Sequence, residues 1–230
     1  MKKGRSFGYA PARRVAEQRA GAWLRHVCLA ATSLCAACAT PPGEVSPGFV
    51  NERVAASYLP LWGRNFLLLG HWGAGITVAP NIAATNAHND NLLPPELILA
   101  QSRSYDLLFY RTANTHPVPA GQVTAGAEVI AYGQGRNGEL REARGRVSSV
   151  SAPIPSRCDA CPWQHAISFD AEAGPGFSGG PLVDAKTGAV IGLVFGYRDG
   201  EGDGGGRRMY AYDISLVLAE MRRLLPPGTR

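Results

Sequence analysis

Short apolar runs separated by turn residues recur through most of this 230-residue chain. Such runs, rich in Val, Ile, Phe or Tyr and bounded by Gly, Pro, Asn or Ser, are typical of strands in an all-β barrel or sandwich. The runs are Asn65–Trp72, Ile76–Val78, Ile82–Ala87, Glu96–Gln101, Tyr105–Arg111, Glu128–Tyr132, Arg144–Val150, Ala166–Asp170, Pro181–Asp184, Ala189–Gly196 and Met209–Tyr212. Only the segment 213–225 predicts a helix, with Asp213 as its cap, one apolar face and two prolines after it.

A single serine, Ser178, lies in the glycine- and proline-rich run Gly174–Asp184. A turn between two strands is the simplest interpretation, because turns are made of these residues. The same surroundings suit a nucleophile, since small residues let a substrate carbonyl approach and glycines let consecutive N–H groups point to one spot.

The order of a base and an acid around that serine separates the possible folds. Gly176–Gly180 matches the G-x-S-x-G elbow of α/β-hydrolases, but that fold needs a histidine after the serine and none follows. The order of the subtilisins needs an aspartate before the histidine. The first aspartate is Asp90, and the two histidines after it have no recognisable context. The order that remains is His88, Asp106, Ser178.

Further segments accompany these three residues in a fixed order. They are Gly73–Val78, Thr85–His88, Ser104–Leu108, Gly126–Gly133, Gly145–Val150 and Ile167–Ala171. Together with the serine run they resemble the chymotrypsin-like serine peptidases, and more closely the bacterial HtrA-type branch, from about Gly73 to Gly196. The resemblance implies two six-stranded antiparallel β-barrels, about 58–115 and 120–212, with the site in the cleft between them. We expect no PDZ module after the helix.

The resemblance also implies a serine endopeptidase that works through an acyl-enzyme. Ser178 would attack the peptide carbonyl, His88 would take and return the proton, and Asp106 would orient the imidazole. The N–H groups of Gly176 and Ser178 would hold the oxyanion. Asp90 is too near His88 in sequence to face its ring in that geometry. No cofactor or metal is expected. The alternative is a catalytically silent protein of the same fold that serves as a binding or scaffold protein on the cell envelope.

The pocket for the residue before the scissile bond is predicted from the same resemblance. Glu172, Phe195 and Tyr197 would contribute to it. Glu172 stands six residues before Ser178, near the pocket floor of trypsin-like enzymes, where a carboxylate would favour Lys or Arg. A carboxylate turned toward solvent is the other interpretation.

The formal net charge of +5 comes from the N-terminus. Residues 1–37 hold seven Lys or Arg and one acid, whereas the remaining residues hold 16 basic and 17 acidic side chains. Charge therefore gives no support for nucleic-acid binding, and the expected partner is a polypeptide substrate.

Residues 1–39 predict an export signal, with a basic region before the apolar run Val27–Ala39, which is too short to span a membrane. Leu34–Cys38 resembles a lipobox, in which Cys38 would be lipidated; simple cleavage is the rival. We expect the bacterial periplasm or cell envelope, with membrane contact only through such an anchor, or secretion. Residues 40–57 predict a linker, and 58–230 the peptidase domain.

Cys158 and Cys161 form a C-x-x-C pair. A four-ligand zinc site needs a second pair, and His165 adds only a third ligand. A thioredoxin-type redox motif needs a βαβ context, which this sequence pattern does not predict. A local disulfide that closes a loop suits an oxidising compartment and is the interpretation we prefer.

Overall fold

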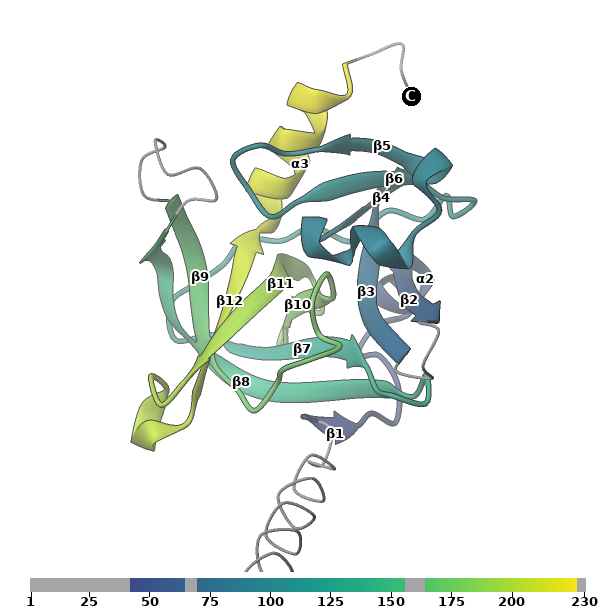
Figure 1. The fold of residues 1–230 in the computed structure, drawn as a ribbon. Coiled ribbons are helices and arrows are strands. Elements are labelled where there is room, and N and C mark those ends of the chain that lie inside the picture. The colour runs from purple at the N-terminus through teal and green to yellow at the C-terminus, as the bar shows by residue number, and fades with distance from the viewer. Residues whose placement is uncertain (1–41, 65–69, 156–163, 227–230) are drawn as a thin grey trace, which may run out of the picture. The chain divides into compact units, whose positions relative to one another are not determined.

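A computed structural model describes residues 42–64, 70–155 and 164–226 (Figure 1). These residues belong to one compact unit, Pro41–Arg230. Among them, no helix is long and apolar enough to cross a membrane. The predictions made for the export signal, for Cys38 and for the Cys158–Cys161 pair lie outside the described residues.

The N-terminal half is a five-stranded antiparallel sheet with the order β2-β3-β4-β6-β5. Its strands are β2 (Tyr58–Arg64), β3 (Gly70–Ala79), β4 (Ile82–Thr85), β5 (Ile98–Gln101) and β6 (Leu108–Arg111). Asn81, with a φ of 63°, lies in the tight turn between β3 and β4, a conformation that asparagine tolerates better than most residues. Two 3-10 helices, η1 (Ala87–Leu92) and η2 (Pro95–Leu97), then lead from β4 to β5. The chain therefore leaves this sheet directly after Thr85.

The C-terminal half is a closed antiparallel barrel. Its strands are β7 (Glu128–Gln134), β8 (Leu140–Ile154), β9 (Gln164–Asp170), β10 (Pro181–Asp184), β11 (Val190–Asp199) and β12 (Arg207–Asp213). The order is β8-β7-β10-β11-β12-β9, and pairing between β8 and β9 closes it. A short 3-10 helix, η3 (Asp203–Gly205), lies between β11 and β12, and β1 (Glu44–Val45) adds to the outer edge of β8.

One hydrophobic core joins the two halves. Ile76 and Phe109 of the first sheet belong to the same buried cluster as Ile130, Val183 and Leu193 of the barrel. Full burial of one such side chain contributes about 1.5–3 kcal/mol. The shared core fixes one sheet against the other, and so holds the loops at their junction.

The predicted C-terminal helix is present as α3 (Ile214–Leu224). Asp213 caps it, because its side chain accepts the N–H of Ser215 at 2.7 Å. Val217 and Met221 are buried on its inner face, as the apolar periodicity requires.

The all-β class, the closed six-stranded barrel and the C-terminal helix are thus confirmed. In the N-terminal half, the described residues form five strands rather than six. Asp106 also lies just before β6, outside the strand predicted over Tyr105–Arg111.

The prediction of a linker over residues 40–57 is wrong for its described part. Beyond β1, residues 52–57 form helix α2 (Glu52–Ser57), capped by the side chain of Asn51. Val54 of this helix is fully buried in the shared core. Pro42, Gly43, Pro47 and Gly48, which suggested a tether, lie instead at bends of a segment that packs on the domain.

Candidate active site

His88 lies in η1, immediately after β4 ends. The chain turns there because the carbonyl of Asn86 accepts the N–H of Asn89 at 3.1 Å. The His88 side chain is 45% exposed, so its ring is anchored at one edge of the first sheet yet open to a substrate.

Asp106 holds His88 at two points. Its Oδ2 lies 2.5 Å from Nδ1 of the ring, and its Oδ1 accepts the backbone N–H of His88 at 3.1 Å. A carboxylate accepts only, so Nδ1 carries the proton and Nε2 is left with a free lone pair. The sequence separation of 18 residues is therefore enough to bring the two side chains together.

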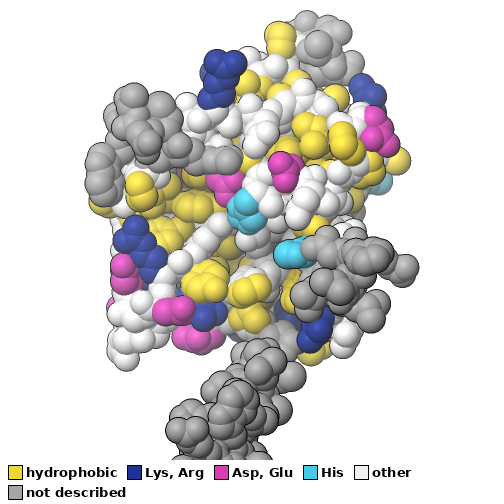
Figure 2. Space-filling view, viewed as in Figure 1, with side chains coloured by type: hydrophobic (Ala, Val, Ile, Leu, Met, Phe, Trp, Pro, Cys, Tyr) yellow, Lys and Arg dark blue, Asp and Glu magenta, His cyan; other side chains and the backbone are white. Residues whose placement is uncertain are grey.

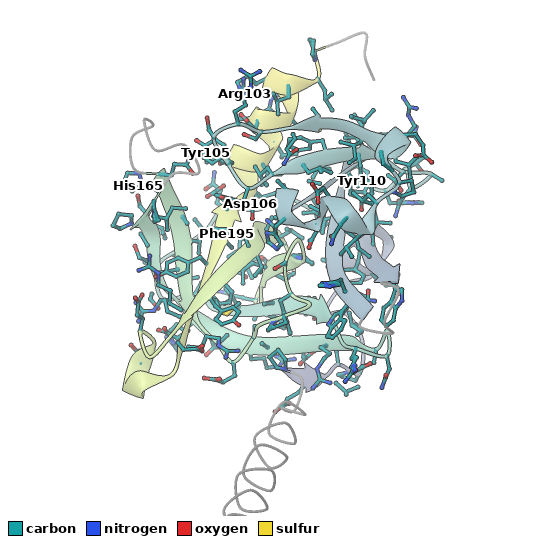
Figure 3. All side chains as sticks on the ribbon, viewed as in Figure 1. Arg103, Tyr105, Asp106, Tyr110, His165 and Phe195 are labelled. Atoms are coloured by element: carbon teal, nitrogen blue, oxygen red, sulfur yellow. The ribbon has the colours of Figure 1, made fainter. Side chains whose placement is uncertain are left out.

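The backbone of Asp106 is held from both halves of the domain. Its N–H donates to the hydroxyl of Tyr212 at 3.0 Å, and its carbonyl accepts from the side chain of Asn86 at the same distance. The Tyr212 ring stacks on Phe195 with centroids 4.2 Å apart. Figure 3 places Asp106 and Phe195 together where β12 meets α3. Sequence patterns gave no signal for the role of Tyr212.

Two consecutive tight turns span residues 174–180, and Ser178 is the second residue of the later one. Gly174 accepts the N–H of Phe177 at 3.0 Å, and Phe177 accepts the N–H of Gly180 at 2.9 Å. The third residue of each turn is a glycine with positive φ, 94° at Gly176 and 81° at Gly179. These are marks of type II turns, which glycine alone enters without strain.

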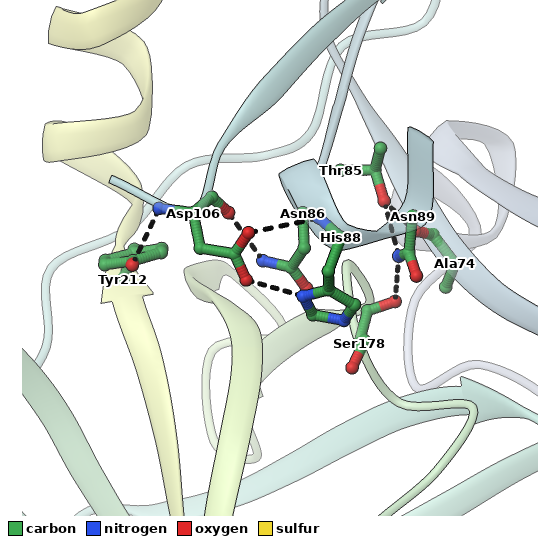
Figure 4. A network of polar contacts seen from close by, with 8 residues as sticks. All are labelled: Ala74, Thr85, Asn86, His88, Asn89, Asp106, Ser178 and Tyr212. Carbon is green, nitrogen blue, oxygen red and sulfur yellow. Dashed lines mark hydrogen bonds and ion pairs between the residues drawn. The ribbon is translucent and has the colours of Figure 1, made fainter. Parts of the chain in front are cut away.

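The backbone of Ser178 is bound to the first sheet. Its carbonyl accepts the N–H of Ala74 at 2.9 Å and the side-chain amide of Asn89 at 3.1 Å. The same amide donates to Thr85 Oγ1 at 2.9 Å. In the close-up, Ser178 lies beside the imidazole of His88 (Figure 4). The network of Ala74, Thr85 and Asn89 was not predicted from the sequence.

The N–H groups of Gly176 and Ser178 donate no hydrogen bond to another residue in the described parts of the chain. A side chain at position 176 would come within 2.6 Å of Trp72 Nε1, so the turn is tightly packed around Gly176.

A hollow of about 380 Å³ lies against His88 and Asp106. Figure 2 shows a histidine at the edge of a hollow lined by hydrophobic side chains on this face. The hollow is lined mostly by aromatic and apolar groups: Phe195, Tyr197, Tyr210 and Tyr212 from the barrel, with Ile154, Pro155, Gly196 and Arg198. Two of the three predicted pocket residues, Phe195 and Tyr197, are among them.

Glu172 does not line this hollow. It lies in a separate hollow with Gly43 and Glu142, and its Oε1 is 3.4 Å from the backbone N of Arg207. The Arg207 guanidinium stacks on Tyr197, 4.3 Å from the ring centroid, and pairs with Asp199 at 2.7 Å. A cation belonging to the chain itself thus occupies the region between Glu172 and Tyr197.

Two antiparallel β units with a His–Asp contact and a serine turn at their junction define the chymotrypsin-like class of peptidase folds. The chain belongs to the trypsin-like peptidase domain family, which matches residues 73–193. No curated protein sequence matches the chain.

Solved structures with this fold include several bacterial proteases. The Rv3671c protease from M. tuberculosis, in its active form, shares 20% identity at a TM-score of 0.59, over 83% of this chain and 94% of that one. The HtrA-type protease AlgW with a tripeptide shares 20% identity at 0.59, over 78% and 63%. The protease domain of MamO from Magnetospirillum magneticum shares 19% at 0.56, over 73% and 97%. At these identities the likeness concerns the fold.

Proposed function

We propose that this protein is a serine endopeptidase that hydrolyses peptide bonds through His88, Asp106 and Ser178. The observation that carries the proposal is the 2.5 Å contact between Asp106 Oδ2 and His88 Nδ1, with Ser178 on the other side of the ring. A family match over residues 73–193 supports the peptidase class.

His88 acts as the base in this proposal. With Nδ1 donating to Asp106, Nε2 accepts the hydroxyl proton of Ser178 as Oγ attacks the substrate carbonyl carbon. The imidazolium that forms is stabilised by the Asp106 carboxylate, whose side chain is 17% exposed. The same proton then passes to the leaving amine, which departs as the acyl-enzyme forms. Water then gives a proton to Nε2 and attacks the acyl carbon. The bond from that carbon to Ser178 Oγ breaks, Oγ takes the proton back from Nε2, and the carboxylic acid product is released.

The developing oxyanion is assigned to the N–H groups of Gly176 and Ser178. Both amides lack intramolecular acceptors in the described residues, and two type II turns fix their orientation. Donors held in place before the reaction need no reorganisation, and one such donor typically lowers the barrier by roughly 3 kcal/mol.

The substrate residues before the scissile bond are assigned to the hollow beside His88. Its aromatic lining suits apolar side chains. Glu172 already faces the N–H of Arg207, so we propose no Lys or Arg preference based on Glu172.

A fluorophosphonate probe on the full-length protein tests the proposal. The probe should label the wild type but not Ser178→Ala. Ser151→Ala is the control and should still be labelled, because Ser151 is an exposed serine in β8 that does not line the hollow beside His88. The wild type should also cut a peptide library, with products identified by mass spectrometry. Absence of both labelling and cleavage in a folded protein would favour the silent scaffold.

Export and lipidation of Cys38 are proposals that rest on the N-terminal sequence alone. Expression in a bacterium should yield a membrane-bound form whose mass includes a lipid on Cys38, and Cys38→Ala should release it. A soluble mature form with unmodified Cys38 would favour simple cleavage.

A further inference from the structure

The segment Pro42–Ser46, here called the N-terminal strap, crosses the barrel next to the serine turn. Its strand β1 pairs with β8, with Glu44 opposite Glu142 and Val45 opposite Arg141. The N–H of Ser46 donates to the carbonyl of Leu140 at 2.9 Å. The strap is therefore part of the domain rather than a tether to it.

Gly43 brings the strap into contact with residues 174–180, here called the serine turn. Its N–H donates to the carbonyl of Glu172 at 2.8 Å, and its φ is 75°. A Cβ at this position would lie 2.7 Å from Cζ of Phe177 and 2.8 Å from the carbonyl oxygen of Glu142. The backbone of the strap thus lies directly on the Phe177 ring, with no room for a side chain.

Phe177 connects the two proposed oxyanion donors. It stands between Gly176 and Ser178 in sequence, and its side chain is fully buried. On another side of the ring, a Cβ at Gly133 of β7 would lie 2.6 Å from Phe177 Cγ. The ring is therefore enclosed by glycine backbone from β7 and from the strap, so its position depends on Gly43.

The Arg141 side chain binds the backbone of the strap. Its guanidinium donates to the carbonyl of Pro42 at 3.0 Å and to that of Gly43 at 2.6 Å, and pairs with Glu139 at 3.1 Å. The Arg141 residue is only 7% exposed. A planar guanidinium can bind two carbonyls at once in a way that an ammonium cannot.

From these contacts we propose that the N-terminal strap is a positioning element for the serine turn, whose amides at Gly176 and Ser178 are the proposed oxyanion donors. It touches no substrate; it acts by holding Phe177 and the Glu172 carbonyl, and thereby the direction of the Gly176 and Ser178 amides. The inference rests on the proposed peptidase function for its effect on rate, but its effect on the turn does not require activity.

The test compares Gly43→Ala with Gly126→Ala in the full-length protein. Both glycines have a φ of 75°, but nothing lies within 4 Å of a Cβ at Gly126, so the control has the same backbone strain without the contact with Phe177. Active sites are counted by exhaustive fluorophosphonate labelling, and kcat and KM are measured on a peptide from the library.

Gly43→Ala should lower kcat per labelled site by about tenfold or more, approaching the loss of one oxyanion donor, with KM within about twofold. Gly126→Ala should retain the kcat of the wild type. Hydrogen exchange of the peptide covering 173–181 should be faster in Gly43→Ala only.

A second pair of variants covers the case in which Gly43→Ala does not fold. Arg141→Lys keeps the charge but loses one carbonyl contact, and Arg144→Lys is its exposed control, 66% exposed and paired only with Glu142 among the described residues. Equal kcat and equal exchange within each pair would overturn the proposal. An inactive wild type with faster exchange in Gly43→Ala would instead sink the peptidase function and leave the strap's role intact.

Discussion

Asp106 binds both the ring and the backbone of His88. Oδ2 contacts Nδ1 at 2.5 Å, while Oδ1 accepts the N–H of the same residue at 3.1 Å. The second contact fixes the carboxylate relative to the start of η1, so the ring and its acid move together. This arrangement sets the tautomer of His88.

Asp106→Asn should reduce kcat by about 10³–10⁴-fold, because an amide can donate to Nδ1 and stabilise the wrong tautomer. The loss is measured as peptide cleavage per folded protein, with circular dichroism as the check on folding. Asp90→Asn is the matched control, since Asp90 is an exposed aspartate in η1, the 3-10 helix that contains His88. A similar loss in both variants would remove Asp106 from its assigned role.

Gly176→Ala should lower kcat by about 10²–10³-fold, as expected when one oxyanion donor is displaced. The added methyl group would meet Trp72 and the carbonyl of Gln134 at a position with a φ of 94°. Gly138→Ala is the control, because Gly138 has a φ of 83° and open space around it. If Gly176→Ala cleaves as fast as Gly138→Ala, the amide of Gly176 is not a donor.

Tyr212→Phe should destabilise the fold by about 1 kcal/mol, because the N–H of Asp106 loses its acceptor. The stacking on Phe195 remains, so kcat should fall only several-fold. Chemical denaturation and peptide cleavage measure the two effects. Tyr110→Phe should cause neither, since the buried hydroxyl of Tyr110 has no hydrogen-bond partner in the described residues. Equal stability of Tyr212→Phe and wild type would contradict this account.

Glu220→Gln should lower Tm by about 2–4 °C at pH 7. Hydrogen bonds from Arg223 and Ser102 hold the pKa of Glu220 below its ordinary value, although burial opposes this. Because its pKa is lowered in the folded state, Glu220 stabilises the folded protein at pH values above the ordinary glutamate pKa of about 4.3. The difference between variant and wild type should therefore shrink as the pH falls below that value. Glu128→Gln, in an exposed pair with Arg146, should show no difference at any pH.

The sequence predicted the β class and the helix well, because both depend on local patterns. The helix at Ile214–Leu224 follows from its cap and apolar spacing. The linker prediction failed because composition cannot distinguish a free proline- and glycine-rich segment from one that packs. The burial of Val54 depends on a surface supplied by the shared core.

Within the site, the sequence order and the resemblance predicted that His88 and Asp106 lie together, and the two side chains are in contact. They could not identify Tyr212 or Asn89, since each acts on a residue distant in the chain: Asp106 for one and Ser178 for the other. Such partners are set by tertiary packing and leave no local pattern. The same reason hid Arg207, which stacks on Tyr197 in the predicted specificity region.

Ser178 is joined to both halves through its backbone. Its carbonyl binds Ala74 of β3, and the next N–H, of Gly179, binds the carbonyl of Val194 in β11. Spreading the halves apart would break these bonds and displace the nucleophile. For the peptidase function proposed above, we therefore expect a polypeptide to reach Ser178 as an exposed, locally unfolded stretch laid along the surface. Stably folded proteins should resist cleavage until heat or another agent loosens them.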